Sequence, residues 1–262
     1  MADTADSDAI ARNVEAVFAN IRRAAQRAGR PADSIRLIAV TKSVSVDRIR
    51  LAIDAGVRLL GENRLQEGVP KLTALGPRGD LAWHFIGRLQ RRKVKAVVGR
   101  FQMIHSLDSV ELAAEIDRRA GEAGLCQPVL LEVNIGGEPS KAGFLPSAVP
   151  DALAALDGMP NLSVRGLMAI PPPASEPEAA RPYFRRVSEL ARSVAHPGFR
   201  RVRMEHLSMG MSQDYEIAVE EGATMVRVGT AIFGARPIPV TRHASRVTGV
   251  GDPERREKPE GL

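Results

Sequence analysis

A lysine directly follows the first strongly apolar segment of the sequence. Residues 35–40 form an apolar run, which ends at Thr41 and Lys42. Such a run predicts a buried parallel strand, and α/β proteins place their chemistry at the carboxyl ends of these strands. An amine in that position can attack a carbonyl group and form a Schiff base. A single lysine at a strand end could equally extend to solvent. The residues at the other strand ends must therefore distinguish a reactive amine from an exposed lysine.

Two turns rich in glycine and hydroxyl groups follow the last two predicted strands. They are residues 208–212, Ser-Met-Gly-Met-Ser, and residues 229–231, Gly-Thr-Ala. Glycine lets backbone amides approach an anion, and hydroxyls and a helix start add further donors. Barrels often hold phosphate with the loops after strands seven and eight. The two turns together therefore predict a phosphate cup.

A lysine opposite a phosphate cup suits a phosphorylated aldehyde or ketone. A partly desolvated, cation-rich mouth should lower the lysine pKa below its usual value of ~10.4, which leaves more of the nucleophilic form. Two ligand classes fit, namely pyridoxal phosphate and the sugar phosphate of an aldolase. Arg227 favours the first, because it could donate to the ring nitrogen of a planar cofactor. Glu62 is the only nearby carboxylate for an aldolase, and the alternative is that its turn at 61–63 is simply structural.

Other strand ends bring polar or soft side chains to the same mouth. These are Asn63, His84, His105, Asn134 and Met168. The methionine is expected to fill space around the mouth. The five histidines lack the spacing of metal ligands, so no metal site is predicted.

The elements that position these residues alternate between strand and helix. The predicted strands span residues 35–40, 57–60, 83–86, 101–105, 128–135, 162–170, 205–209 and 224–228. The predicted helices span about 10–28, 46–55, 65–72, 90–98, 108–123, a segment to 156, 178–195 and 212–221, with Asp108 as an N-cap. Eight such units predict a (β/α)8 TIM barrel with an extra N-terminal helix.

An open doubly wound sheet is the alternative architecture. It would usually carry a glycine-rich fingerprint after its first strand, whereas this strand ends in Thr-Lys-Ser. Residues 1–8 are expected to form a flexible leader and residues 9–239 the barrel. Residues 240–262 are rich in proline, glycine and charge, which predicts a disordered tail.

Composition excludes several classes of function. The 262 residues are 44% hydrophobic and 26% charged, as in ordinary globular proteins. The net charge is +6, but aromatic residues make up only 4%, too few to stack bases among the arginines, so no nucleic acid partner is expected. No apolar run could span a bilayer, and the acidic start is unlike a secretory signal. Cys126 is the single cysteine, is expected to be buried, and is compatible with a reducing cytoplasm.

Five motifs in order resemble the pyridoxal phosphate homeostasis proteins, single-barrel relatives of the alanine racemase N-terminal domain. The motifs are Ala-Val-Thr-Lys at 39–42, Gly-Glu-Asn-Arg-Leu-Gln-Glu at 61–67, Trp-His-Phe-Ile-Gly at 83–87, residues 208–212, and residues 225–234. The resemblance covers roughly residues 10–236. It implies a fold-type III barrel that binds pyridoxal 5'-phosphate through a Schiff base on Lys42.

The resemblance also implies roles for individual residues. Arg227 would face the pyridine nitrogen, and Ser208, Gly229 and Thr230 would belong to the phosphate cup. The remaining expected cofactor-binding residues are Asn63, His84, Met168 and Gly210. One departure is Arg92, where the family usually has asparagine.

The expected function is to bind, buffer and deliver pyridoxal phosphate without specific catalysis. Related racemases use a tyrosine from a second domain of the partner chain for one face of the substrate. Here the sequence ends about 30 residues after strand eight, and Tyr183 and Tyr215 fall in predicted outer helices. The alternative is an amino-acid racemase or decarboxylase. Apo-enzymes are expected partners and a monomer or weak dimer the expected state, while Lys141 is expected to be exposed rather than a second reactive amine.

Overall fold

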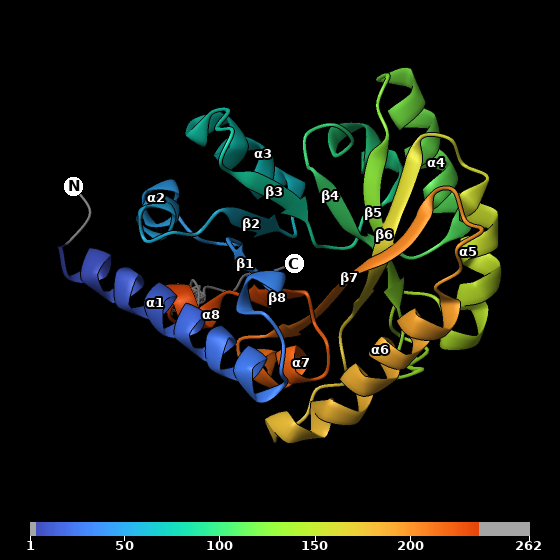
Figure 1. Ribbon diagram of the computed structural model, residues 1–262. Helices are drawn as coiled ribbons and strands as arrows, with labels where there is room; N and C mark the ends of the chain where they lie inside the picture. Colours follow the sequence, from blue (N-terminus) through green and yellow to red (C-terminus); the bar gives the residue numbers. More distant parts are fainter. Residues whose placement is uncertain (1–3, 236–262) are drawn as a thin grey trace, which may run out of the picture.

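Eight parallel strands close into a barrel in chain order. In the computed structural model, which describes residues 4–235, each strand pairs with its sequence neighbour and β8 pairs with β1 (Figure 1). The strands are β1 (Arg36–Val40), β2 (Leu59–Glu62), β3 (Ala82–Phe85), β4 (Met103–Leu107), β5 (Gln127–Val133), β6 (Leu162–Ala169), β7 (Val202–Met211) and β8 (Met225–Val228). Closure confirms the TIM barrel and excludes the open doubly wound sheet, because an open sheet has no β1–β8 pairing.

Helices cover the outside of the barrel. They are α1 (Thr4–Arg27), α2 (Val46–Asp54), α3 (Leu65–Leu75), α4 (Val110–Glu122), α5 (Val149–Asp157), α6 (Arg181–Val194), α7 (Tyr215–Glu220) and α8 (Thr230–Phe233). Four 3-10 helices join them, namely η1 (Ala32–Ser34), η2 (Arg91–Ala96), η3 (Pro146–Ala148) and η4 (Pro177–Ala180). The α-helix predicted over 90–98 is therefore wrong. Its place is taken by η2, which buries only Val94 and so lacks the apolar face that stabilises a longer helix.

The extra N-terminal helix begins earlier than its apolar pattern predicts. Helix α1 starts at Thr4, so residues 4–8 are helical rather than part of a leader. Asp6 explains the difference, because its carboxylate pairs with Arg48 of α2 at 2.8 Å and attaches the first turn to the barrel. The helix buries a stripe that includes Ile10, Val14 and Ile21 and packs against α2, α7 and α8 (Figure 1). The predicted tail at 240–262 and residues 1–3 lie outside the described residues.

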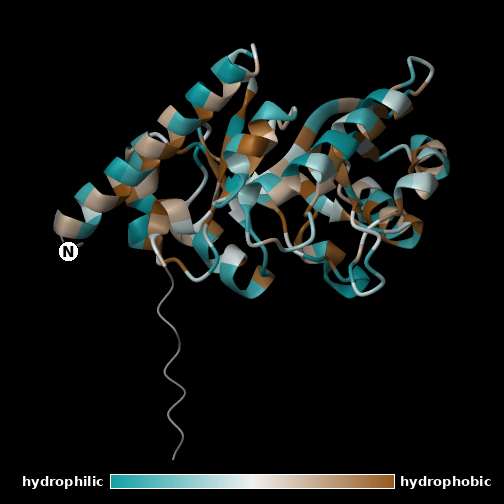
Figure 2. Cartoon of the chain, turned by 90° about the horizontal axis from the view of Figure 1, so that it is seen from below, coloured by the Kyte–Doolittle hydropathy of each residue, from teal (hydrophilic) through white to brown (hydrophobic). Residues whose placement is uncertain are grey.

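Side-chain alternation along the strands divides the core into two layers. One apolar cluster fills the barrel interior and comprises Ile38, Leu59, Met103, Leu130, Met168 and Met225. The larger cluster lies between strands and helices, and Figure 2 shows hydrophobic residues concentrated within and hydrophilic residues on the outer helix faces. Met168 is only 2% exposed, so it belongs to the inner layer beneath the mouth.

Two local predictions around β4 and β5 are wrong. Ser109, not Asp108, caps α4 by accepting a hydrogen bond from the Leu112 amide at 3.3 Å, because β4 continues to Leu107 and the helix begins later. Cys126 is exposed rather than buried, because β5 begins at Gln127 and the cysteine still lies in the preceding turn. Among residues 4–235, no helix combines the length and apolarity needed to cross a membrane.

Candidate functional site

Strand β1 carries Lys42 to the carboxyl-terminal mouth of the barrel. Ile38 lies on the interior face of β1. Successive side chains of a strand point to opposite faces, so Val40 and Lys42 follow Ile38 on the same side. Lys42 is half-buried there, in the turn that separates β1 from α2. The structure thus places the predicted nucleophile at the rim, where the ends of all eight strands converge.

The two predicted phosphate loops meet at one serine hydroxyl. The backbone amides of Gly229 and Ala231 donate to Ser212 Oγ at 3.2 and 3.3 Å. Gly210 allows this meeting, since its φ is +89° and a Cβ there would lie 2.5 Å from the Ala218 side chain. Two amides that converge on one oxygen form a ready donor pair for an anion. Gly229 thus lies where the two loops meet, and Thr230, between the two donating residues, is exposed.

Ser208 is not at this cup. Its side chain is fully buried inside the barrel, where Oγ accepts from Arg227 Nη1 at 2.7 Å. A register shift in the β7–β8 pairing between Ser208 and Met211 separates the inward-facing part of β7 from the loop above it. Ser212 therefore stands in the cup where the resemblance implied Ser208. Both serines belong to the motif at 208–212, and only the register shift shows that Ser208 faces the interior while Ser212 lies in the loop.

Arg227 is held under the mouth by strand carbonyls. Its Nη1 donates to Ser208 O at 2.6 Å and its Nη2 to Ala169 O at 3.0 Å. Burial lowers the pKa of Arg227 to about 10, so the guanidinium stays charged at neutral pH. The Nε–H and one Nη2–H make no hydrogen bond to any residue in the range 4–235. A fixed cation with two unused donors can bind an acceptor from above.

A chain of buried side chains leads away from Arg227 across the barrel. His105 Nδ1 lies 2.9 Å from Ser208 Oγ, and His105 Nε2 lies 2.8 Å from His84 Nδ1. Burial lowers the pKa of His84 to about 3 and that of His105 well below its usual value, so both rings are neutral at pH 7. One assignment of protons satisfies every atom of this chain. Arg227 donates to Ser208, the Ser208 hydroxyl donates to His105, and the His105 N–H donates to His84. His84 is thus a packed residue that supports Arg227 indirectly.

A carboxylate that sequence reasoning missed also faces the barrel interior. Glu132 lies on the same face of β5 as Leu130 and is partly exposed toward the mouth. Burial and the charge of Asp108 raise the pKa of Glu132 to about 7, against the opposing charges of Arg227 and Arg88. The alternation along β5 could have placed Glu132 on the interior face from the sequence. The degree of burial, which changes its pKa, could not be read from the sequence.

Glu132→Gln should remove part of the pH dependence of stability. Between pH 4.5 and 7 the folded protein binds more protons at Glu132 than the unfolded chain does, so the free energy of unfolding falls as pH rises through this window. Because solvent reaches the side chain, we expect the variant to be more stable by about 1–2 kcal/mol at pH 8 and equal to wild type near pH 4. Urea unfolding across this pH range measures the difference.

The exposed Glu15 offers a matched control, since Glu15→Gln changes the same charge outside the barrel interior. An unchanged pH profile in Glu132→Gln would show that the carboxylate is better solvated than its position indicates.

Two of the remaining predicted residues lie at the rim with defined environments. Asn63 is half-buried, and its Oδ1 has no hydrogen-bond partner within residues 4–235. Gly87 allows the close approach of this loop, since a Cβ there would lie 2.2 Å from Asn63 O. Asn134 instead holds its own loop by donating to Glu138 O at 2.8 Å.

Three further residues lie apart from this arrangement. Lys141 forms an ion pair with Glu138 at 2.5 Å and is half-exposed. Arg92, the departure from the family pattern, is exposed and donates to Gln90 at 3.2 Å. Glu62 points into the interface between barrel and α3, which removes the carboxylate that an aldolase would need beside Lys42. In the described range, no group of three or more His, Cys, Asp or Glu side chains could hold a metal ion.

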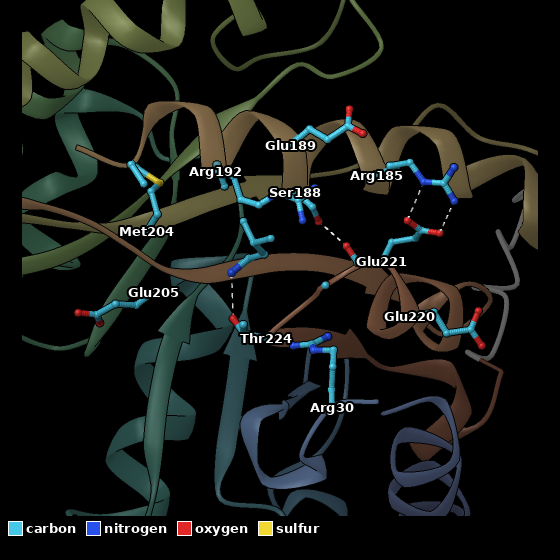
Figure 3. Close-up of a pocket in the computed structure, with 14 residues that line it drawn as sticks. Arg30, Arg185, Ser188, Glu189, Arg192, Met204, Glu205, Glu220, Glu221 and Thr224 are labelled. Carbon is cyan, nitrogen blue, oxygen red and sulfur yellow. Dashed lines mark hydrogen bonds and ion pairs between the residues drawn. The ribbon is translucent and has the colours of Figure 1, made fainter. Parts of the chain in front are cut away.

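Two cavities lie on the outer side of the barrel. A cavity of about 570 Å³ lies between α6, β7 and the turn before β8, and Figure 3 shows its lining, including the ion pair of Arg185 with Glu221. It contains neither Lys42 nor the phosphate loops. A second cavity of about 480 Å³ adjoins the cup, with Ser212 and Ala231 on one side and Asn20 and Tyr215 on the other. The residues predicted to carry the chemistry therefore do not line the larger cavity.

Comparison with known proteins identifies the family. Residues 12–237 match the model of the alanine racemase N-terminal domain. The pyridoxal phosphate homeostasis protein of Aquifex aeolicus is 46% identical over 220 residues, which are 84% of this chain and 95% of the relative. A crystal structure of an unknown protein from Bifidobacterium adolescentis matches with a TM-score of 0.82 and 37% identity, covering 89% of this chain and 98% of that one.

A third relative has been solved with a ligand. PipY of Synechococcus elongatus PCC7942, with PLP bound, matches with a TM-score of 0.74 and 36% identity, covering 86% of this chain and all of that chain. The family resemblance seen in the motifs is confirmed by these matches along most of the sequence. The chain belongs to the family of pyridoxal phosphate homeostasis proteins.

Proposed function

We propose that this protein binds pyridoxal 5'-phosphate at the barrel mouth, with a Schiff base to Lys42. The observation that carries the proposal is that one mouth combines the half-buried lysine, a pair of converging amides and a buried arginine with unused donors. PipY, a relative of similar length, has PLP bound. The residues fit the group, because an aldehyde needs an amine and a phosphate needs clustered donors. The bound cofactor supplies the reactive aldehyde.

The cup of Ser212, Gly229, Thr230 and Ala231 is the proposed phosphate site. The two amides now satisfied by Ser212 Oγ would donate to a phosphate oxygen, and the serine hydroxyl would turn from acceptor to donor. The β8–α8 turn passes β1 at Gly229, where a Cβ would be in ordinary contact with Val40 Cβ at 3.4 Å. The phosphate and the amine would thus be held by neighbouring strands, β8 and β1.

Arg227 is the proposed partner of the pyridine nitrogen. An arginine donates a hydrogen bond but does not give up its proton, so the ring nitrogen stays unprotonated and the ring is a weaker electron sink than one paired with a carboxylate. Ser208 and His105 keep the guanidinium in place from below. A shift of the cofactor absorbance in Arg227→Gln would check this contact.

We propose that the protein buffers and delivers the cofactor rather than turning over amino acids. Racemisation needs proton donors on both faces of the substrate carbon. Lys42 can serve one face, but both tyrosines of the chain lie on outer helices, and the Tyr215 hydroxyl already accepts a hydrogen bond from Asn20 at 2.8 Å. The close relatives are named homeostasis proteins, which supports the same conclusion. An amino-acid racemase or decarboxylase is the alternative.

Incubation with L-amino acids tests this proposal. The cofactor-loaded protein should show no α-proton exchange in D2O and no change of enantiomer ratio, while it restores activity to an apo-enzyme that requires pyridoxal phosphate. Racemisation at ordinary enzymatic rates, on the order of 1 s⁻¹ or faster, would establish the racemase instead. Lys42→Ala is the control, since it should lose both the bound cofactor and any exchange.

The setting of the protein in the cell is a further part of the proposal. We infer a cytoplasmic protein, a monomer or weak dimer, whose partners are apo-enzymes that need the cofactor. A single cysteine, Cys126, is compatible with the reducing compartment in this proposal. Cell fractionation and light scattering of the purified protein measure the two properties directly.

A further inference from the structure

A buried ion pair lies directly behind the turn that carries Lys42. Lys71 of α3 reaches down to the end of β2, where its Nζ lies 2.7 Å from Glu62 Oε1. Both side chains are buried, and Glu62 is fully inaccessible to solvent. Gly68 lets α3 approach this closely, since a Cβ there would lie 3.2 Å from the Glu62 side chain. The pair therefore belongs to the interface between helix and barrel.

Both members of the ion pair form a hydrogen bond with Thr41. Lys71 Nζ donates to the Thr41 carbonyl oxygen at 2.6 Å, and the Thr41 hydroxyl donates to Glu62 Oε1 at 2.6 Å. The Thr41 carbonyl belongs to the peptide group that links Thr41 to Lys42. The same carbonyl accepts the Val44 amide at 3.0 Å, so Lys71 and the local turn hold this peptide group together.

The other side of Lys42 is attached to the same helix. The Ser43 amide donates to Glu67 Oε2 at 2.6 Å, and this carboxylate lies 3.7 Å from Lys71 Nζ. Ser43 has a φ of +60°, which among the described residues is the single left-handed conformation outside glycine. The hydrogen bond lowers the pKa of Glu67, so the acceptor stays charged. Residues 41 and 43 are both pinned to α3, with Lys42 between them.

This arrangement is costly if it serves stability alone. Burying two charges costs more free energy than packing apolar side chains of the same size, unless every polar atom is paired. Glu62 Oε2 has no hydrogen-bond partner among residues 4–235, so the pairing is incomplete. A strained serine beside it adds to the cost. Strain and buried charge that meet next to a reactive group are typical of preorganised sites.

We propose that Lys71 is a positioning residue for Lys42. Through Glu62, Thr41 and Glu67 it fixes the main chain on both sides of the lysine and so orients the amine toward the ligand. The inference rests on the proposed role of Lys42. A protein that must release its cofactor needs an amine held in one place, because a preorganised turn loses less conformational freedom at each binding event.

The charge-neutral double variant Lys71→Met/Glu62→Gln tests the proposal without leaving one charge buried and unpaired. We expect the affinity for pyridoxal phosphate to fall about tenfold, since the hydrogen bond of a charged group to the Thr41 carbonyl is lost. The visible circular dichroism of the bound cofactor should weaken as well, because the Schiff base is no longer held in one orientation.

Gln127→Met is the matched control. Gln127 is a buried polar residue at the opposite end of the barrel, where its amide donates to Phe101 O at 3.1 Å, so its replacement costs stability away from the mouth. Affinity and circular dichroism should stay as in wild type in this variant. If the double variant does not fold, the partly exposed Glu67→Ala removes the anchor of Ser43 and should still weaken binding severalfold.

Three results would be decisive. Unchanged affinity and dichroism in the folded double variant, or in Glu67→Ala where that replaces it, would overturn the role of Lys71. Equal losses in Gln127→Met would do the same, because they would show an effect of general stability. Failure of borohydride to fix the cofactor to Lys42 in the wild-type protein would instead refute the proposed function, and with it the reason for positioning this lysine.

Discussion

Lys42→Ala is expected to abolish covalent binding of pyridoxal phosphate. No other lysine of the described range combines a strand end, partial burial at the mouth and a neighbouring phosphate cup, since Lys71 is committed to Glu62 and Lys141 to Glu138. The wild-type protein should absorb visible light as a protonated Schiff base does, and the variant should not. Borohydride reduction followed by peptide mapping should place the pyridoxyl group on Lys42.

Lys141→Ala provides the control for this experiment. It removes a half-exposed amine in the loop after β5 and should leave both the absorbance and the labelled peptide unchanged. If Lys42→Ala kept the absorbance of the wild type, or if the label appeared on the peptide with Lys141, the assignment of the reactive amine would be wrong.

Removal of the phosphate from the ligand is expected to have the second large effect. Pyridoxal should bind roughly a hundredfold or more weakly than pyridoxal phosphate, because charged acceptors make hydrogen bonds worth about 1.5–3 kcal/mol each and the cup offers at least two amides. Ser212→Ala should lower the affinity for pyridoxal phosphate about tenfold while the affinity for pyridoxal stays the same. Titration of the four combinations by absorbance measures both effects.

Ser208→Ala is the informative comparison. Its hydroxyl lies beneath the mouth and contacts Arg227 and His105, so its loss should affect both aldehydes equally. Equal affinity of the wild-type protein for the two aldehydes would refute the cup. A selective loss of phosphate affinity in Ser208→Ala, rather than in Ser212→Ala, would show that the resemblance placed the phosphate more accurately than the geometry does.

The sequence alone was sufficient to predict the barrel and the rim at which its polar strand ends gather. Apolar runs of strand length and helices with a 3.6-residue stripe are local patterns, and their eightfold alternation leads to a closed parallel sheet. Because parallel strands all end at the same rim, Lys42 and the turn at 229–231 had to converge there. One element was of the wrong type, since the helix predicted over 90–98 is the 3-10 helix η2. The other errors in the fold lay at element ends, such as the early start of α1 at Thr4, where a distant ion pair to Arg48 extends the helix.

The tertiary structure decided what each polar residue does at that rim. Ser208 and Ser212 lie four residues apart in one motif, and only the register shift of β7 against β8 sends the first inward and the second to the cup. His105 meets Ser208 across 103 residues of sequence, and Lys71 reaches Thr41 across 30. The raised pKa of Glu132 and the lowered pKa of His84 come from burial by other strands. Local patterns carry no record of such contacts, because desolvation and side-chain pairing depend on which strands become neighbours and in what register.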